Sequence, residues 1–285
     1  MNGLKIRSCL CSSSRTCLVF LVFLGVCGTT VCAQEKLDLL PDVNQSVSAM
    51  SLGAGSVASL DTYLSPSEYT GVYIAGDYDR ATLKSTDVFF PYRHLFIHFG
   101  AGLMKNHAGS MSADNVMIHG YGSWSHKIVT NGIWESLLGV SALGDLGGVL
   151  NSANTNNPFN AKFQLSAGAI FDNILHFRLK NRPMALKGTL QLPLLGVGFA
   201  PDNGEFYFDM ASRGNLSGDF HVVTPFTVQT LSTRFALDVP ICSQVVQVGY
   251  SLYLMRGKLG GNFSGLVHSY ATVGLVHRFE HLKWK

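Results

Sequence analysis

Short segments in which large apolar residues alternate with small or polar ones recur along this chain from about residue 93 onward. Between Phe163 and Phe171 the odd positions are apolar, while Gln164, Ser166 and Gly168 lie between them. Neighbouring residues of a β-strand point to opposite faces, so the pattern predicts strands with one apolar face. Repeated segments of about ten residues of this kind are typical of a membrane-spanning β-barrel.

The charged content indicates which way the apolar face points. Only 14% of the residues are charged, against roughly 25% in a typical soluble domain. A soluble barrel needs a charged exterior, whereas the second face of these strands is small and weakly polar. We therefore predict that the apolar face points outward into lipid. The residues expected to face lipid are Leu95, Ile97, Phe99, Phe163, Leu165, Phe171, Phe235, Leu237, Val246, Val248, Tyr250, Leu252 and Leu254.

Ten segments are predicted as strands of an all-β, antiparallel up-and-down transmembrane barrel. An even number returns both ends of the chain to the same side of the membrane. The region 200–230 could add a hairpin and give twelve strands, or Phe206 to Phe208 could form a short helix or a plug. The ten segments are Ser46 to Ser56, Tyr69 to Arg80, His94 to Lys105, Asn115 to Lys127, Ile133 to Gly147, Ala161 to His176, Met184 to Phe199, Leu231 to Val239, Gln244 to Met255 and Leu266 to His281.

The connections between these segments differ in length. Short connections rich in Gly, Asn and Pro carry turn chemistry and are placed on the periplasmic side. Five longer ones then fall on the opposite side and are expected to be cell-surface loops. They are Val57 to Glu68, Asn106 to Asp114, Gly148 to Asn160, Ala200 to Thr230 and Lys258 to Gly265.

The first 33 residues have the features of a secretory signal peptide. Basic residues precede an apolar stretch from Cys17 to Val26, and Val31-Cys32-Ala33 forms a small-residue cleavage pattern. We expect cleavage after Ala33, since the apolar stretch is shorter than the roughly 20 residues of a spanning helix. Residues 34–285 would then form one outer-membrane β-barrel, inserted by the cell's barrel-insertion machinery.

Removal of this leader changes the charge and the cysteine count. It holds three of the 21 basic residues and no acidic one, which leaves 18 basic against 18 acidic residues. Nothing basic then favours nucleic acid as a partner. Only Cys242 remains, and the ten histidines show no metal-ligand spacing. We expect no intrachain disulfide, metal or cofactor.

The second face of the strands supplies candidate lumen residues. A barrel of ten to twelve strands lies between the filled eight-stranded barrels and the open porins, so we expect a narrow or plugged lumen. Balanced interior charges favour a paired, hydrogen-bonded network over a transport role for the same residues. The candidates are His98, His119, Glu135, Lys162, Gln164, Arg234 and Asp238, with Tyr121, Lys187, Gln191 and Gln247 on the same face.

Four runs of residues carry a resemblance to a known family. They are Leu60 to Pro66 with Glu68-Tyr69, Asn156 to Pro158 with Ala161-Lys162, Leu192 to Val197, and Leu237 to Pro240. These runs resemble a family of uncharacterised outer-membrane β-barrel proteins of Bacteroidota, known as a domain of unknown function. The resemblance implies a barrel in the outer membrane and supplies no catalytic residues.

Catalytic patterns are weak in this sequence. An outer-membrane lipid hydrolase needs a serine and a histidine within hydrogen-bond reach, and on one strand this favours a spacing of two. No histidine has a serine at that spacing.

Asp77 and Asp79 face the same side, and two carboxylates alone make a weak cation site, so we assign them to a solvated barrel rim.

The run from Asn151 to Pro158 is rich in asparagine. Asparagines tolerate turn geometry, so a solvated loop explains it, although the amides of Asn154, Asn156 and Asn157 could bind a surface sugar or lipid headgroup.

The sequence thus predicts a barrel that acts as a narrow pore or as a structural, surface-exposed barrel without catalysis. A surface-binding barrel that uses its long loops and a lipid hydrolase are the alternatives.

Overall fold

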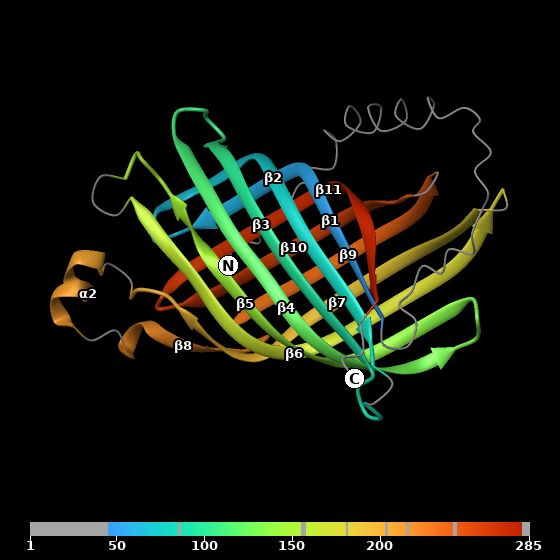
Figure 1. Ribbon diagram of the computed structural model, residues 1–285. Helices are drawn as coiled ribbons and strands as arrows, with labels where there is room; N and C mark the ends of the chain where they lie inside the picture. Colours follow the sequence, from blue (N-terminus) through green and yellow to red (C-terminus); the bar gives the residue numbers. More distant parts are fainter. Residues whose placement is uncertain are drawn as a thin grey trace, which may run out of the picture. The chain divides into compact units, whose positions relative to one another are not determined.

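Eleven strands of the described chain form one antiparallel sheet, and ten of them close into a barrel (Figure 1). The structure is a computed structural model that describes residues 45–84, 87–154, 158–180, 182–202, 205–214, 217–241 and 244–280. Consecutive strands pair with each other, and the pairings β1–β11 and β7–β9 complete the ring. The strands are β1 Gln45–Asp61, β2 Ser65–Leu83, β3 Tyr92–Asn106, β4 Ser112–Thr130, β5 Trp134–Leu150, β6 Phe159–Leu179, β7 Arg182–Phe199, β8 Phe220–Val223, β9 Val228–Ile241, β10 Gln244–Leu259 and β11 Asn262–Glu280.

The prediction of a ten-stranded antiparallel barrel is confirmed, and each predicted segment corresponds to one barrel strand. Most strands are longer than predicted at one end of the barrel, the end opposite the start of β1 and the end of β11. β1 continues to Asp61 and β2 begins at Ser65, so only residues 62–64 connect them. β10 and β11 are joined by Gly260 and Gly261, which have φ of 55° and 79°. The expected long loops at 57–68 and 258–265 are therefore wrong, and the one at 106–114 is shortened to residues 107–111. Gly and Ser interrupt the alternation near these strand ends without ending the strands.

The region between β7 and β9 does not add a hairpin to the barrel, so the alternative of twelve strands is wrong. It contains helix α2 (Tyr207–Arg213), the 3₁₀ turn η1 (Ser217–Asp219) and the four-residue β8, which pairs only with the end of β7. The short helix considered for Phe206 to Phe208 is present as α2. Both α2 and β8 lie at one end of the barrel, at the left of Figure 1. No helix of the described residues is long and apolar enough to cross a bilayer.

The outer surface of the barrel is apolar along every side. Leu52, Val72 and Leu103 expose 76%, 65% and 67% of their surface. Of the residues predicted to face lipid, the following are exposed: Leu95, Phe99, Phe163, Leu165, Phe235 and Tyr250. The others are partly buried by neighbouring side chains on the same face. The inner face instead carries buried Ser, Asp, His, Gln and Tyr.

One seam of the barrel is much shorter than the rest. β7 and β9 pair only from Ala185 to Gln191, whereas β1 and β11 pair from Gln45 to Asp61. Prolines lie just beyond both ends of the short ladder. At the Ala185 end, continuing the register would place Pro183 opposite Pro240. At the Gln191 end, Pro193 follows two residues later. Proline has no N–H to donate to a ladder, and it is found at unpaired strand edges. The sequence of β7 and β9 therefore limits this seam to its centre.

Candidate functional site in the barrel lumen

All seven candidate lumen residues lie on the inner face of the barrel. His98, His119, Gln164, Arg234 and Asp238 are buried, while Glu135 and Lys162 are partly buried towards the two barrel ends. Lys187, Gln191 and Gln247 are inside as well. The assignment of Asp77 and Asp79 to a solvated rim is wrong, because both side chains point into the middle of the lumen. Both residues lie within β2, between the two ends of the barrel.

The first group of interior side chains is centred on Arg234. Its guanidinium donates to Asp79 of β2 and to Gln247 Oε1 (2.8 Å), and it lies 5.0 Å from the centre of the Phe96 ring. β9 and β2 are separated by β10, β11 and β1 around the ring, so the Arg234–Asp79 pair spans the lumen. Asp79 also meets His94 Nε2 at 3.0 Å.

The same group extends to the opposite wall. His94 Nδ1 lies 3.7 Å from Asp172 of β6, and Gln247 Nε2 donates to Asp238 at 2.8 Å. Asp238 pairs with Lys187 Nζ at 2.6 Å. Acidic and basic side chains thus alternate across the barrel from wall to wall. We call this group the arginine layer: Asp79, His94, Asp172, Lys187, Arg234, Asp238 and Gln247.

The second group lies nearer to the end that carries α2. His98 Nδ1 meets Asp77 at 2.7 Å, and its Nε2 is 2.7 Å from the Tyr73 hydroxyl. His268 stacks on Tyr73 with ring centroids 4.2 Å apart. We call this group the histidine layer: Tyr73, Asp77, His98, His119, Asp145, Tyr253, His268 and Tyr270.

A second His–Asp pair completes the histidine layer. His119 Nδ1 lies 2.5 Å from Asp145, and the Tyr253 hydroxyl donates to the same carboxylate at 3.1 Å. The Tyr270 hydroxyl contacts His98 Nδ1 at 2.9 Å. These aromatic and imidazole rings fill the cross-section of the barrel. The strand pattern identified His98 and His119 but missed His268 and the tyrosines of this layer, although Tyr73 lies on the same face of β2 as Asp77.

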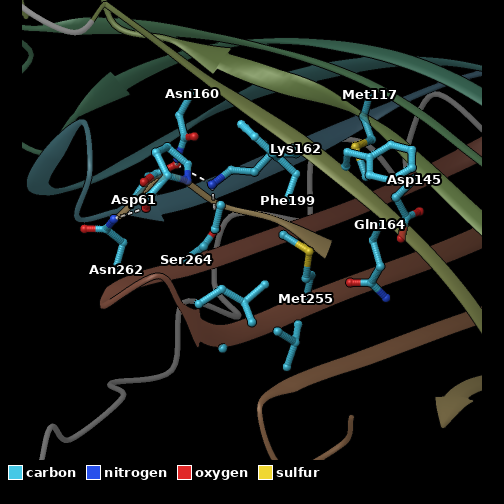
Figure 2. A pocket seen from close by; sticks show the side chains of 16 residues that line it. Asp61, Met117, Asp145, Asn160, Lys162, Gln164, Phe199, Met255, Asn262 and Ser264 are labelled. Atoms are coloured by element: carbon cyan, nitrogen blue, oxygen red, sulfur yellow. Dashed lines mark hydrogen bonds and ion pairs between the residues drawn. The ribbon is translucent and has the colours of Figure 1, made fainter. Parts of the chain in front are cut away.

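A third polar group surrounds a cavity at the end of the barrel near α2 (Figure 2). Lys162 Nζ pairs with Asp61 at 2.5 Å and donates to Ser264 at 2.9 Å. Asn160 donates to Asp61 at 2.8 Å. Gln164, two residues from Lys162 on the same strand, also lines the cavity. We call this space, of about 50 Å³, the rim cavity.

Helix α2 is tied to the wall of the rim cavity by Tyr207. Its hydroxyl donates to Asn160 Oδ1 (3.2 Å) and accepts from the backbone N–H of Ala161 (2.7 Å). Burial raises the pKa of Tyr207 to about 12, and nearby carboxylates act in the same direction. The phenol is therefore neutral at physiological pH and can hold both hydrogen bonds.

Three cavities follow one another through the lumen. The rim cavity of about 50 Å³ is lined by Asp145, which bonds to His119 and Tyr253 of a cavity of about 10 Å³. That second cavity shares Thr189 and Arg234 with a third, of about 30 Å³. Spaces of this size hold single waters or small groups of waters. Side chains of the two layers therefore separate these small cavities along the barrel.

The predicted asparagine site is only partly described. Asn154 Nδ2 donates to the carbonyl of Leu64 at 2.9 Å, which ties the β5–β6 connection to the β1–β2 turn. Asn156 and Asn157 lie outside the described residues, as do the predicted signal peptide and its cleavage position. Within the described ranges, no group of three or more His, Cys, Asp or Glu side chains is arranged to hold a metal ion.

Comparison with known proteins assigns the sequence to a family. Residues 16–285 match the model of DUF3316, a protein family of unknown function. The chain belongs to this family. No curated protein sequence matches it.

Two solved outer-membrane structures are similar in fold. One is the translocator domain of the autotransporter NalP from Neisseria meningitidis, with 12% identity and a TM-score of 0.35, covering 93% of this chain and 94% of that one. The other is the COG4313 outer membrane channel from Pseudomonas putida F1, with 11% identity and a TM-score of 0.34, covering 87% and 100%.

Proposed function

We propose that this DUF3316 protein is an outer-membrane barrel whose lumen is a narrow, normally occluded pore for water and small ions, without catalysis. The row of three small cavities, each lined in part by charged or hydrogen-bonding side chains, supports this proposal. Each break in the row consists of one layer of side chains, and side chains change rotamer far more easily than backbone moves. Arg234 and Thr189 line both the second and the third cavity, so movement of the longer Arg234 side chain would widen the connection between them.

The apolar exterior supports the membrane location. An exposed apolar face on every side of the barrel would be unstable in water, and it matches the lipid-facing band of outer-membrane barrels. We infer a Gram-negative host, such as a member of the Bacteroidota, export through a signal peptide cleaved after Ala33, and insertion by the barrel-insertion machinery. Surface adhesion has less support, because several of the loops expected for it are tight turns.

A sealed structural barrel is the second candidate. The wall-to-wall charge pairs of the arginine layer favour it, because a paired and hydrogen-bonded interior is costly to open. The two candidates differ in one respect: a pore conducts when its narrowest layer is removed, whereas a sealed barrel loses stability and still does not conduct.

Single-channel recording separates the two candidates. The protein would be purified from the outer membrane of a Gram-negative host and inserted into planar bilayers, with Arg234→Ala and Arg234→Met compared to the natural chain. Methionine keeps most of the side-chain length without the charge. Phe235→Ala, on the lipid side of the same strand, is the matched control.

The pore proposal expects brief, small steps for the natural chain and larger steps for Arg234→Ala. Arg234→Met would stay close to the natural conductance, because its side chain still separates the second and third cavities. Inserted protein that shows no steps in any of the variants would refute the pore and favour the sealed barrel. Failure to reach the outer membrane would contradict the location itself.

A further inference from the structure

The unpaired part of the β7–β9 seam lies beside the rim cavity. β7 continues beyond Gln191 to Phe199. On the edge that faces β9, residues 192–195 of β7 are unpaired, and Gly196–Phe199 pair with β8. Residues 228–231 at the start of β9 have no β7 partner in the described ladder. Among the described strands, the β7–β9 seam is therefore unpaired along this stretch as well as at its other end, where residues 182–184 and 239–241 have no partner across the seam.

The outside of the open stretch is apolar. Leu194, Leu195 and Val222 expose 52%, 62% and 64% of their surface, and Leu192 and Phe220 are exposed as well. Open sheet edges are avoided in the hydrocarbon region of a bilayer, because unpaired backbone groups there find no water. An open edge among lipid-facing leucines therefore requires an occupant or a function.

The rim cavity borders the open stretch. Val228, which begins β9 and has no β7 partner, lines the cavity, and so does Phe199 at the end of β7 that pairs with β8. Met117, Met255 and Leu259 give it apolar walls. The space therefore borders the seam at Val228 on one side and polar side chains on the other.

Two hydrogen-bond donors of β6 meet in the cavity. Gln164 is only 4% exposed, and its Nε2 has no hydrogen-bond partner among the described residues. The Lys162 ammonium has three protons, of which Asp61 and Ser264 take two. A buried donor without a partner is costly, so the site favours a ligand that brings acceptor oxygens.

We propose that the open part of the β7–β9 seam is a lateral entrance from the bilayer, and that the rim cavity binds the carboxylate of a single-chain amphiphile of the fatty-acid class. Lys162 and Gln164 would bind the carboxylate oxygens, and the acyl chain would lie between the strands against Leu192 and Leu195. A carboxylate suits a cavity of about 50 Å³, whereas a phosphodiester headgroup is larger. This inference does not depend on ion passage through the two layers.

The entrance is tested by closing the seam. Continuing the register places Leu192 opposite Leu231, one step beyond the last pair. Both would be replaced by Cys in a Cys242→Ser background and joined by a disulfide, or by a short thiol-reactive crosslinker where the strands stand further apart. The matched control, Leu190→Cys with Thr233→Cys, joins two residues that already pair.

The probe is oleate. Its association with the protein, purified from the outer membrane without the leader and placed in lipid nanodiscs, is measured before and after reduction of the disulfide, or with and without the crosslinker. We expect the 192/231 bridge to slow oleate association at least tenfold, with recovery when it is opened, while the 190/233 bridge has no effect. Equal association rates for the open and bridged forms would overturn the lateral entrance.

The headgroup assignment is tested separately. Gln164→Leu keeps the side-chain size and the Lys162–Asp61 pair, and it is expected to weaken oleate binding at least fivefold. Methyl oleate is expected to bind more weakly than oleate to the natural chain. Equal binding of the ester and the acid, or an unchanged affinity in Gln164→Leu, would overturn the assignment. Conductance measured on the same variants separates this inference from the pore, since neither change touches the arginine layer.

Discussion

The Asp238–Lys187 pair offers a quantitative test of how tightly the lumen is held. Asp238 is fully buried, forms an ion pair with Lys187 Nζ at 2.6 Å and accepts a hydrogen bond from Gln247 Nε2 at 2.8 Å. The Lys187 side chain is 23% exposed. Opposite charges about 4 Å apart attract by roughly 4 kcal/mol at an effective dielectric constant of about 20. Both charges must lose water to reach this site, so the net value of the pair is smaller than the attraction.

The perturbation is a double-mutant cycle with Asp238→Leu, Lys187→Met and the combined variant. Asp238→Leu leaves the Lys187 ammonium without its partner, and the loss of one member of a buried pair costs about 3–5 kcal/mol. The combined variant replaces both charges by apolar groups of similar size, which is often close to neutral. We therefore expect a coupling energy of about 2–4 kcal/mol between the two positions.

The assay is equilibrium unfolding by denaturant in phospholipid vesicles, followed by the fluorescence of Trp124 and Trp134. The matched control is the Arg93–Asp87 pair, in which the two side chains are 41% and 27% exposed at 3.2 Å. An exposed pair of this kind contributes about 0.2–1 kcal/mol. A coupling for Asp238–Lys187 no larger than that of the control would refute a tightly paired lumen.

Two further predictions concern single residues. A Cβ at Gly100 would collide with the Tyr73 hydroxyl and ring, so Gly100→Ala is expected to destabilise the barrel by about 1–3 kcal/mol in the same unfolding assay. The pKa of Asp87 lies below its ordinary value, because the Phe90 N–H and then Arg93 bond its carboxylate. A lowered pKa gives stability that is present above the unfolded pKa and is lost as the pH falls through the folded pKa. NMR titration of the Phe90 amide should therefore show the bond lost at a pH below the ordinary pKa of an aspartate, and an ordinary Asp87 pKa would contradict this.

The strands could be predicted because they depend on a local rule. Alternation in a run such as Phe163 to Phe171 reports the two faces of a strand, whatever the partner. The strand ends could not be predicted in the same way: near Asp61 and Ser65, small and polar residues line a rim where neither face needs to be apolar. The composition therefore suggested a loop where the ladder continues.

The interior partners could not be predicted from the sequence. Which residue meets Arg234 depends on the stagger of ten strands around the barrel, and this places Asp79 within reach although it lies 155 positions away in the sequence. A local reading instead assigned Asp79 to a solvated rim. The sequence does carry a signal for the short seam. Pro183, Pro193 and Pro240 lie at its limits and lack the N–H that a continuous ladder uses.

The position of the short seam has a consequence for the order of the chain. In this barrel the first and last strands are joined by a long ladder from Gln45 to Asp61, and the poorly joined neighbours, β7 and β9, are internal to the sequence. A circular permutant that links the paired ends of β1 and β11 and begins at β9 would move the weak junction to the new termini. Such a chain would keep every β-ladder between neighbouring barrel strands. Residues 200–227 would then follow β7 as the new C-terminal segment.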